Sequence, residues 1–171
     1  MNRAPFPRVL ARCLADGDAE TGLRICVATS PRWIAWGTFG EGGEWLDSFL
    51  ALDTNPPVAG CVLGAALVTR AQLALAVDRA VAERRARDGL RLCRDAGDPR
   101  WIAAALNVLS ETALRAGEAR EAVTRADEAV AVARSADDGW NEGYALGTRA
   151  GQGTKPPAIP TARASSAVRN T

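Results

Sequence analysis

The sequence predicts an all-α protein, built as a stack of antiparallel helical hairpins that repeats about every 40 residues. Three observations support this prediction. Hydrophobic residues make up 47% of the 171 residues but aromatic residues only 5%, and a core rich in alanine, leucine and valine suits close-packed helices better than sheets. Small and apolar residues recur at a spacing of 40. Within a copy, they follow the spacing of an amphipathic helix.

The repeat is clearest when residues 37–52 and 117–132 are aligned with the segment halfway between them. Five positions then hold a small or apolar residue in all three copies. They are Gly42, Ala82 and Ala122; Leu46, Ala86 and Ala126; Phe49, Gly89 and Ala129; Leu50, Leu90 and Val130; and Leu52, Leu92 and Val132. Stacked hairpins that contact mainly their neighbours should bury six of these residues between helices. The six are Ala82, Ala86, Leu90, Ala122, Ala126 and Val130.

The same pattern divides the chain into a leading helix and turn, a helical-repeat domain over 18–150, and a tail that we expect to be disordered. The leading segment is 1–17, the hairpins are 18–52, 58–97 and 98–137, the half repeat is 138–150, and the tail is 151–171. Helices are expected at about 6–15, 19–36, 62–77, 101–116 and 139–150, with a second helix completing each hairpin.

Residues that start or stop helices mark these elements. Gly37 suits the left-handed position that ends a helix, and Pro31 should kink or break the first long helix. Asp98 precedes Pro99 as a capping carboxylate, and Asp138 takes the same place 40 residues later. The prolines of the loop at 53–57 separate the first two hairpins.

The half repeat has no second helix to cover it. Where the turn at Gly117 should recur 40 residues later, the chain has Pro157, and the tail holds three prolines and no acidic residue. We therefore expect a truncated product of marginal stability, in which Trp140, Tyr144 and Leu146 are partly exposed.

Composition excludes several functions. There are 21 basic and 20 acidic residues, and without the three basic residues of the tail the balance over 1–150 is 18 − 20 = −2, which does not suit a nucleic-acid-binding module. The chain has no histidine and no C-x-x-C pair, which predicts no metal site, no catalytic triad, no cofactor and no enzymatic activity. No apolar run approaches the roughly 20 residues that span a membrane, and the first residues do not form a signal peptide. A cytoplasmic protein with reduced thiols is expected.

Two other residue groups fit structural roles better than chemistry. The carboxylates Glu41, Glu44 and Asp47 are interpreted as a solvated helix exterior, since a general acid needs an environment that shifts its pKa. A phosphate cradle would follow a strand, so a turn between two helices is the interpretation favoured for four glycines. They are Gly37, Gly40, Gly42 and Gly43.

The tryptophans offer the one candidate site. Trp33, Trp36 and Trp45 cluster around the first hairpin turn. Packing in the core and between hairpins would account for them, because tryptophan buries a large area. The functional alternative is an aromatic patch that contacts a partner.

A series of motifs then resembles a known family, the tetratricopeptide-like region of large LuxR/AfsR-type transcriptional regulators of high-GC actinobacteria. The resemblance covers roughly residues 8–150. The motifs are Gly17-Asp18-Ala19-Glu20-Thr21-Gly22-Leu23-Arg24, Trp33, Trp36-Gly37, Glu41-Gly42, Trp45-Leu46, Leu92-Cys93-Arg94, Ala96-Gly97-Asp98, Ala133-Arg134, Asp138-Gly139-Trp140 and Ala145-Leu146.

The resemblance implies a right-handed α-solenoid that binds a protein or a small effector on its concave face. In that family the repeats follow an ATPase domain and often precede a helix-turn-helix, and neither motif is present in this chain. We therefore expect a non-catalytic regulatory interaction module, a fragment of such a regulator. The alternative is a free-standing tetratricopeptide-like adaptor unrelated to transcription.

The charge of −2 over residues 1–150 predicts that this chain alone does not bind DNA in a sequence-specific way. In an electrophoretic mobility shift at physiological salt, no complex should survive competitor DNA. Binding through the basic tail should disappear when residues 151–171 are removed. A specific complex that persists after this removal contradicts the prediction.

Overall fold

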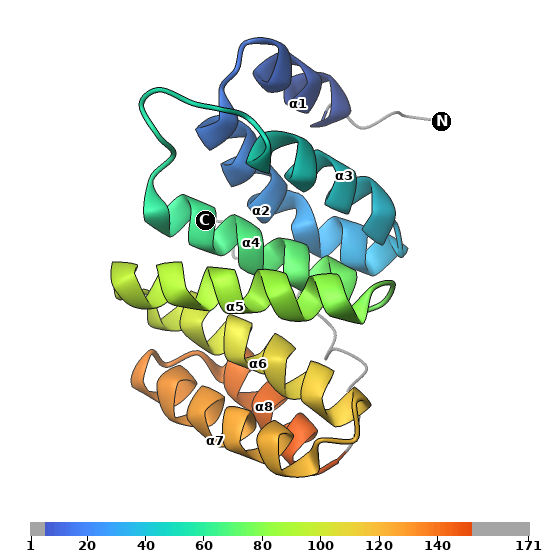
Figure 1. Ribbon diagram of the computed structural model, residues 1–171, viewed down its shortest axis with the longest axis vertical. Coiled ribbons are helices and arrows are strands. Elements are labelled where there is room, and N and C mark those ends of the chain that lie inside the picture. Colours follow the sequence, from blue (N-terminus) through green and yellow to red (C-terminus); the bar gives the residue numbers. More distant parts are fainter. Residues whose placement is uncertain (1–5, 152–171) are drawn as a thin grey trace, which may run out of the picture.

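The computed structural model describes residues 6–151, and this part of the chain is all-helical, with eight helices and no strand. Figure 1 shows the helices following one another from the blue end of the chain to the red end. Their bounds are α1 Phe6–Ala15, α2 Ala19–Trp36, α3 Phe39–Leu50, α4 Gly60–Ala74, α5 Arg79–Ala96, α6 Pro99–Arg115, α7 Ala119–Ser135 and α8 Gly139–Arg149.

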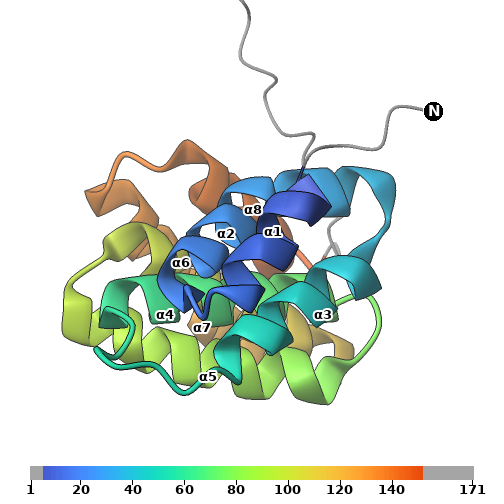
Figure 2. The ribbon, with the colours of Figure 1, turned by 90° about the horizontal axis from the view of Figure 1, so that it is seen from above.

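Packing between the helices is strictly local along the chain. Each helix contacts the next one, and α2, α4, α6 and α8 also contact one another in sequence. The helix α1 packs on both α2 and α3, and Figure 2 shows it lying across this end of the molecule. Within residues 6–151, no helix packs against one more than two places away.

Aspartates begin four of the helices. The side chains of Asp18, Asp78, Asp98 and Asp138 each accept a hydrogen bond from the backbone N–H three residues later, at 3.0–3.3 Å. This bond satisfies one of the free N–H groups of a helix N-terminus. The expected caps at Asp98 and Asp138 are therefore present. Gly37 ends α2 in the left-handed conformation, with φ of 70°, as expected.

Of the two expected effects of Pro31, a kink or a break, the break is absent, because α2 runs through this residue as one helix. Proline has no N–H to donate to the carbonyl oxygen of Val27, four residues earlier. The Ser30 hydroxyl donates a hydrogen bond to that oxygen at 2.8 Å instead. A local side chain thus supplies the donor that proline removes.

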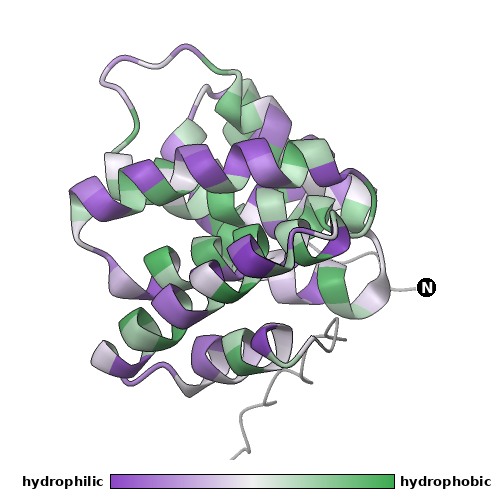
Figure 3. Ribbon diagram, turned by 60° about the horizontal axis from the view of Figure 1, so that its bottom comes forward, coloured by the Kyte–Doolittle hydropathy of each residue, from purple (hydrophilic) through white to green (hydrophobic). Residues whose placement is uncertain are grey.

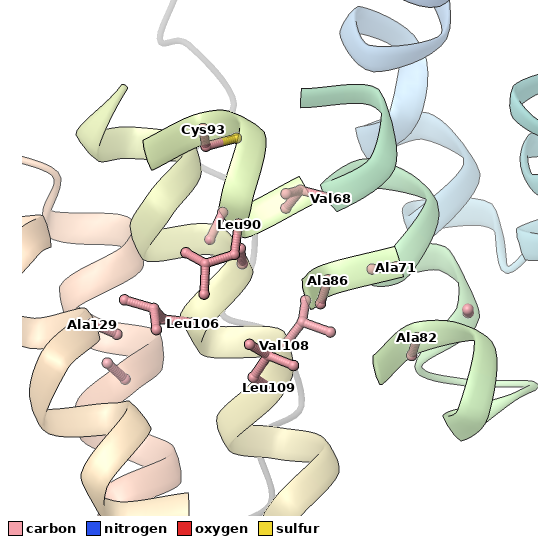
Figure 4. Packing of buried hydrophobic residues seen from close by; sticks show 14 of the residues in the cluster. Val68, Ala71, Ala82, Ala86, Leu90, Cys93, Leu106, Val108, Leu109 and Ala129 are labelled. Atoms are coloured by element: carbon pink, nitrogen blue, oxygen red, sulfur yellow. The ribbon is translucent and has the colours of Figure 1, made fainter. Parts of the chain in front are cut away.

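The six residues that the repeat register places between helices are all buried, which confirms this prediction. The exposed fraction is 0–2% for the four alanines, 5% for Leu90 and 7% for Val130. Figure 3 shows hydrophobic residues turned toward neighbouring helices and hydrophilic ones on the outer faces. Figure 4 shows side chains of α4, α5, α6 and α7 meeting in one cluster, with Val68 near Leu90 and Leu106 near Ala129.

Helix limits differ most from expectation around α4. The expected helix at 62–77 begins at Gly60 and ends at Ala74, because the backbone N–H groups of Val77 and Asp78 both bond the Ala74 carbonyl oxygen and close a turn. The side chains of Trp140 and Tyr144 are half-buried and Leu146 is 40% exposed, which confirms their expected partial exposure. The expectation of disorder falls on residues that lie, apart from Gly151, outside those that the structure describes.

Buried glycines set the distance between α4 and α5, and we expect Gly89→Ala to lower the free energy of unfolding by about 1–3 kcal/mol. A Cβ at Gly89 would lie 2.7 Å from Val68 Cγ2 and 3.1 Å from two backbone atoms of α4. The matched control is Gly143→Ala in α8, where a Cβ meets nothing within 4 Å. It should raise stability by about 0.5–1 kcal/mol through helix propensity.

Urea denaturation followed by circular dichroism measures both variants. Equal stabilisation of the two variants would show that α4 and α5 can separate at little energetic cost.

Candidate functional site

The most distinctive surface feature is a hollow between α1, α2 and α3, which we call the aromatic hollow. Its empty volume is about 410 Å³, including space open to solvent. The residues that line it are Phe6, Pro7, Leu10, Thr29, Arg32, Trp33, Trp36, Thr38, Glu41 and Trp45. All three tryptophans selected from the sequence thus lie around one hollow.

The three tryptophans differ in exposure. Trp33 is buried at 7%, while Trp36 is 65% exposed. Trp45 is half-buried, and its ring stacks on that of Phe49 with 6.3 Å between the ring centroids. Core packing therefore accounts for Trp33 and for part of Trp45. It does not account for Trp36.

Arg32 brings a positive charge to the same place. Its guanidinium carbon lies 3.9 Å from the ring centroid of Trp36 and 5.5 Å from that of Phe6. Such cation–π contacts contribute about 0.5–1 kcal/mol at exposed sites. They hold the Trp36 ring and the guanidinium in a defined arrangement at the edge of the hollow.

Two further polar groups face the hollow without partners among the described residues. The Thr38 hydroxyl oxygen is buried and makes no hydrogen bond, and Glu41 forms no ion pair there. An apolar hollow with a few convergent polar groups is the usual composition of a binding site. The arrangement can therefore bind an apolar group next to a polar one.

Sequence reasoning missed Phe6, Arg32 and Thr38. Phe6 belongs to a helix whose packing the sequence did not specify. Arg32 carried a usable signal, because it stands four residues before Trp36 in a predicted helix, and side chains at that spacing are neighbours.

The carboxylates of α3 divide into two kinds. Glu41 and Glu44 are exposed, as expected for a solvated helix face. Asp47 is different, because its oxygens pair with Arg70 of α4 at 2.9 Å and with Arg85 of α5 at 3.4 Å. The Asp47 side chain is 42% exposed, as an exterior position requires, but it also links three helices, which the sequence did not indicate.

The glycine interpretation was also wrong in part. Gly37 lies in the turn between α2 and α3, but Gly40, Gly42 and Gly43 lie inside α3. A Cβ at Gly42 would lie 2.5 Å from the Trp33 ring, and one at Gly43 would lie 3.2 Å from Arg70. The two buried glycines therefore permit close packing against those side chains.

A second hollow, between α5, α6 and α7, is lined mostly by charged side chains. Within it Glu83 pairs with Arg87 at 2.5 Å and Glu121 with Arg125 at 2.7 Å. The pairing of Glu121 with Arg125 is the one expected from their spacing. Because these charges are already matched, the aromatic hollow is the better candidate site.

One carboxylate is fully buried. Glu111 of α6 is 1% exposed and accepts a hydrogen bond from Arg115 Nε at 2.8 Å, while its other oxygen has no partner. Arg115 also donates to the backbone carbonyl oxygen of Leu75 at 2.5 Å. The pair thus joins α6 to the end of α4, which is a structural role.

The cysteines show no sign of a shared site. Cys13, Cys26 and Cys93 are buried and Cys61 is exposed. Burial raises the pKa of Cys26 to about 12 and that of Cys93 to about 11. Among the described residues, no cluster of three or more cysteine or acidic side chains is arranged to hold a metal ion.

None of the eight helices is both long enough and apolar enough to cross a membrane, within the part of the chain that the structure describes. Searches against protein-family models, curated proteins and solved structures each found no match to this chain. The geometry and the sequence patterns therefore carry the functional argument.

The thiol environments predict selective alkylation. At pH 8 the thiolate, which is the reactive form, makes up about one part in ten thousand of Cys26 and about one part in a thousand of Cys93. We expect iodoacetamide to modify exposed Cys61 rapidly and these two residues only in denaturant. Peptide mass spectrometry after timed alkylation measures the three rates. If Cys26 or Cys93 is labelled as fast as Cys61 in the folded protein, the burial of these two thiols is contradicted.

Proposed function

We propose that this chain is a non-catalytic, tetratricopeptide-like interaction module that binds a protein partner at the aromatic hollow. The observation that carries the proposal is Trp36, which is 65% exposed while Arg32 holds its ring in place. Tryptophan and arginine are the residues most enriched at the energetic centres of protein interfaces. A rigid, exposed pair loses little conformational entropy on binding.

Several features support the repeat part of the proposal. The buried positions recur every 40 residues, and packing joins only helices one or two places apart. This local packing is typical of repeat proteins, in which each unit contacts only its neighbours. On this view α2 with α3, α4 with α5, and α6 with α7 are the three hairpins, and their first helices form the inner row.

The aromatic hollow is a better binding surface than the middle of the inner row. Residues 103–113 of α6 are all buried, as are residues 64–69 of α4. The family resemblance implies a protein or a small effector bound on the concave face. Such a ligand would find few accessible side chains along the inner row. The hollow instead offers the exposed ring of Trp36, the Arg32 cation and the exposed Glu41 carboxylate.

The absence of histidine supports a non-catalytic role. The shifted pKa values also have structural causes. Hydrogen bonds from Thr21 lower the pKa of Asp18, those from Arg24 and the Ala59 backbone lower that of Glu20, and burial raises those of Cys26 and Cys93. These groups cap a helix, pair on a surface or pack in a core, and none lines the aromatic hollow.

The finer proposal is that the chain is a segment of a LuxR/AfsR-type regulator, in which it contacts neighbouring ATPase or DNA-binding parts. Only the motifs between residues 8 and 150 support it. Sequencing the flanking locus tests it directly. An ATPase reading frame upstream, or a helix-turn-helix downstream in another frame, supports the regulator; flanks with neither favour the free-standing adaptor.

The test of the hollow is quantitative capture of partners from host cytosol with Trp36→Ala. The partners that wild-type protein enriches should fall at least tenfold with this variant, which corresponds to about 1.4 kcal/mol of binding free energy. The matched control is Val77→Ala, since Val77 is 67% exposed and is not one of the residues that line the hollow. Capture by Trp36→Ala equal to capture by the control rejects the hollow as the binding site.

A further inference from the structure

Among the residues that the structure describes, no helix covers the outer face of α8, and the repeat register shows how unusual that is. Leu146 stands 40 residues after Leu106, which stands 40 after Ala66, which stands 40 after Cys26. The first three of these residues are 0% exposed, while Leu146 is 40% exposed. The same register position is thus fully buried in α2, α4 and α6 but partly exposed in α8.

The neighbouring positions behave in the same way. Ala103 and Ser110 of α6 are both buried at 0%. Their equivalents in α8, Gly143 and Ala150, are exposed. We call Gly143, Leu146 and Ala150 the open face of α8.

In each of the three earlier helix pairs, the second helix packs on the first, at the face equivalent to the open face of α8. The helix α3 packs on α2, α5 on α4, and α7 on α6. At the last of these interfaces, the Ser110 hydroxyl donates a hydrogen bond to the Ala122 carbonyl oxygen at 2.7 Å, and Figure 4 shows Leu106 close to Ala129. Among the described residues, α8 packs only against α6 and α7.

Ion pairs fix the direction in which the open face points. Glu142 pairs with Arg134 at 2.7 Å, and Arg149 pairs with Asp127 at 3.1 Å. Both pairs join α8 to α7. The opposite side of α8 is held on α6, where Asn107 donates a hydrogen bond to Asn141 Oδ1 at 3.0 Å. The open face therefore cannot turn inward without breaking these contacts.

Glycine use gives a second sign. A Cβ added at Gly64 or Gly89 would lie under 3.0 Å from α5 or α4, so these glycines admit a neighbouring helix. A Cβ added at Gly139 or Gly143 would meet nothing within 4 Å. A glycine inside a helix costs up to about 1 kcal/mol relative to alanine, and at Gly143 no contact among the described residues offsets that cost.

We propose that the open face of α8 binds an amphipathic helix of a partner protein, antiparallel to α8, and so completes a fourth hairpin. The helix carries a stripe of small and aliphatic residues, as α7 does where it covers α6. This interface continues the one that α6 makes with α7. The inference rests on the proposed repeat function but does not depend on the aromatic hollow.

The helix dipole specifies the partner further. An antiparallel helix begins beside the last turn of α8 and ends beside its first turn, and its own dipole favours acidic residues in its first turn and basic residues in its last turn. The sequence of α7 has this arrangement, with Glu121 in its first turn and Arg134 in its last. A peptide with the sequence of residues 119–135 is therefore the natural probe.

The test measures fluorescence anisotropy of that labelled peptide with the full chain. Binding should be saturable, and Leu146→Glu should weaken it at least tenfold, because a carboxylate would be buried without a partner. Val77→Glu is the matched control, since it places the same charge at an exposed apolar residue outside the open face. A peptide carrying Ala126→Glu and Val130→Glu should not bind, and circular dichroism verifies that each protein variant is folded.

Four results overturn the proposal. One is no wild-type binding up to about 1 mM peptide, the limit of weak specific affinity. Another is equal binding by Leu146→Glu and wild type. The third is self-association of the wild type that Leu146→Glu abolishes, which makes a second copy the occupant. The fourth is binding that appears only after removal of residues 152–171, which makes the chain's own end the occupant. Trp36→Ala should bind the peptide normally, so failure of the aromatic hollow and failure of the open face are distinguishable.

Discussion

Close approach of helices through small residues is the constraint on which the rest of this structure depends. Gly64 and Gly89 face each other across α4 and α5, and a Cβ at either would lie under 3.0 Å from the opposite helix. Fully buried alanines extend this seam along α5, and others line α7, which packs on α6. Each small side chain buries little area, at about 25 cal/mol per Å². Stability must therefore come from many short contacts, and the tolerance for added volume is small.

This constraint explains why so much of the fold could be predicted. Small residues recur at a spacing of 40 at the helix contacts of this chain, so Ala82 and Ala122 indicate the register without any aromatic landmark. The caps at Asp98 and Asp138 follow from local chemistry and were equally visible. Helix start and stop residues predicted the structure less well where contacts beyond the helix signal itself decide whether a helix continues. Pro31 stays inside α2 because Ser30 bonds the Val27 carbonyl oxygen, and nothing in the repeat pattern indicates that bond.

The aromatic hollow was predictable only in part. Trp33 and Trp36 are three residues apart on one helix, which already places them on the same side. Their relation to Trp45 follows from the turn that joins α2 to α3. The hollow itself also needs Phe6, and that requires α1 to pack against α2 and α3. The sequence indicated that α1 exists but not where it lies, because its contacts involve no repeated position.

The two ends of the described part of the chain differ in how their apolar surface is covered. In the proposed repeat arrangement, each end exposes an apolar face unless another element covers it. At the start, α1 covers part of α2 and α3, and Leu10 of α1 is 1% exposed in that contact. At the other end, the Leu146 side chain lies at a position that the three earlier helices bury completely. Val123, in the first turns of α7, is 39% exposed, and the ion pair of Arg149 with Asp127 joins the end of α8 to the same helix. Among the described residues no further helix packs on α8, so Leu146 stays exposed where the equivalent residues of the three earlier helices are covered.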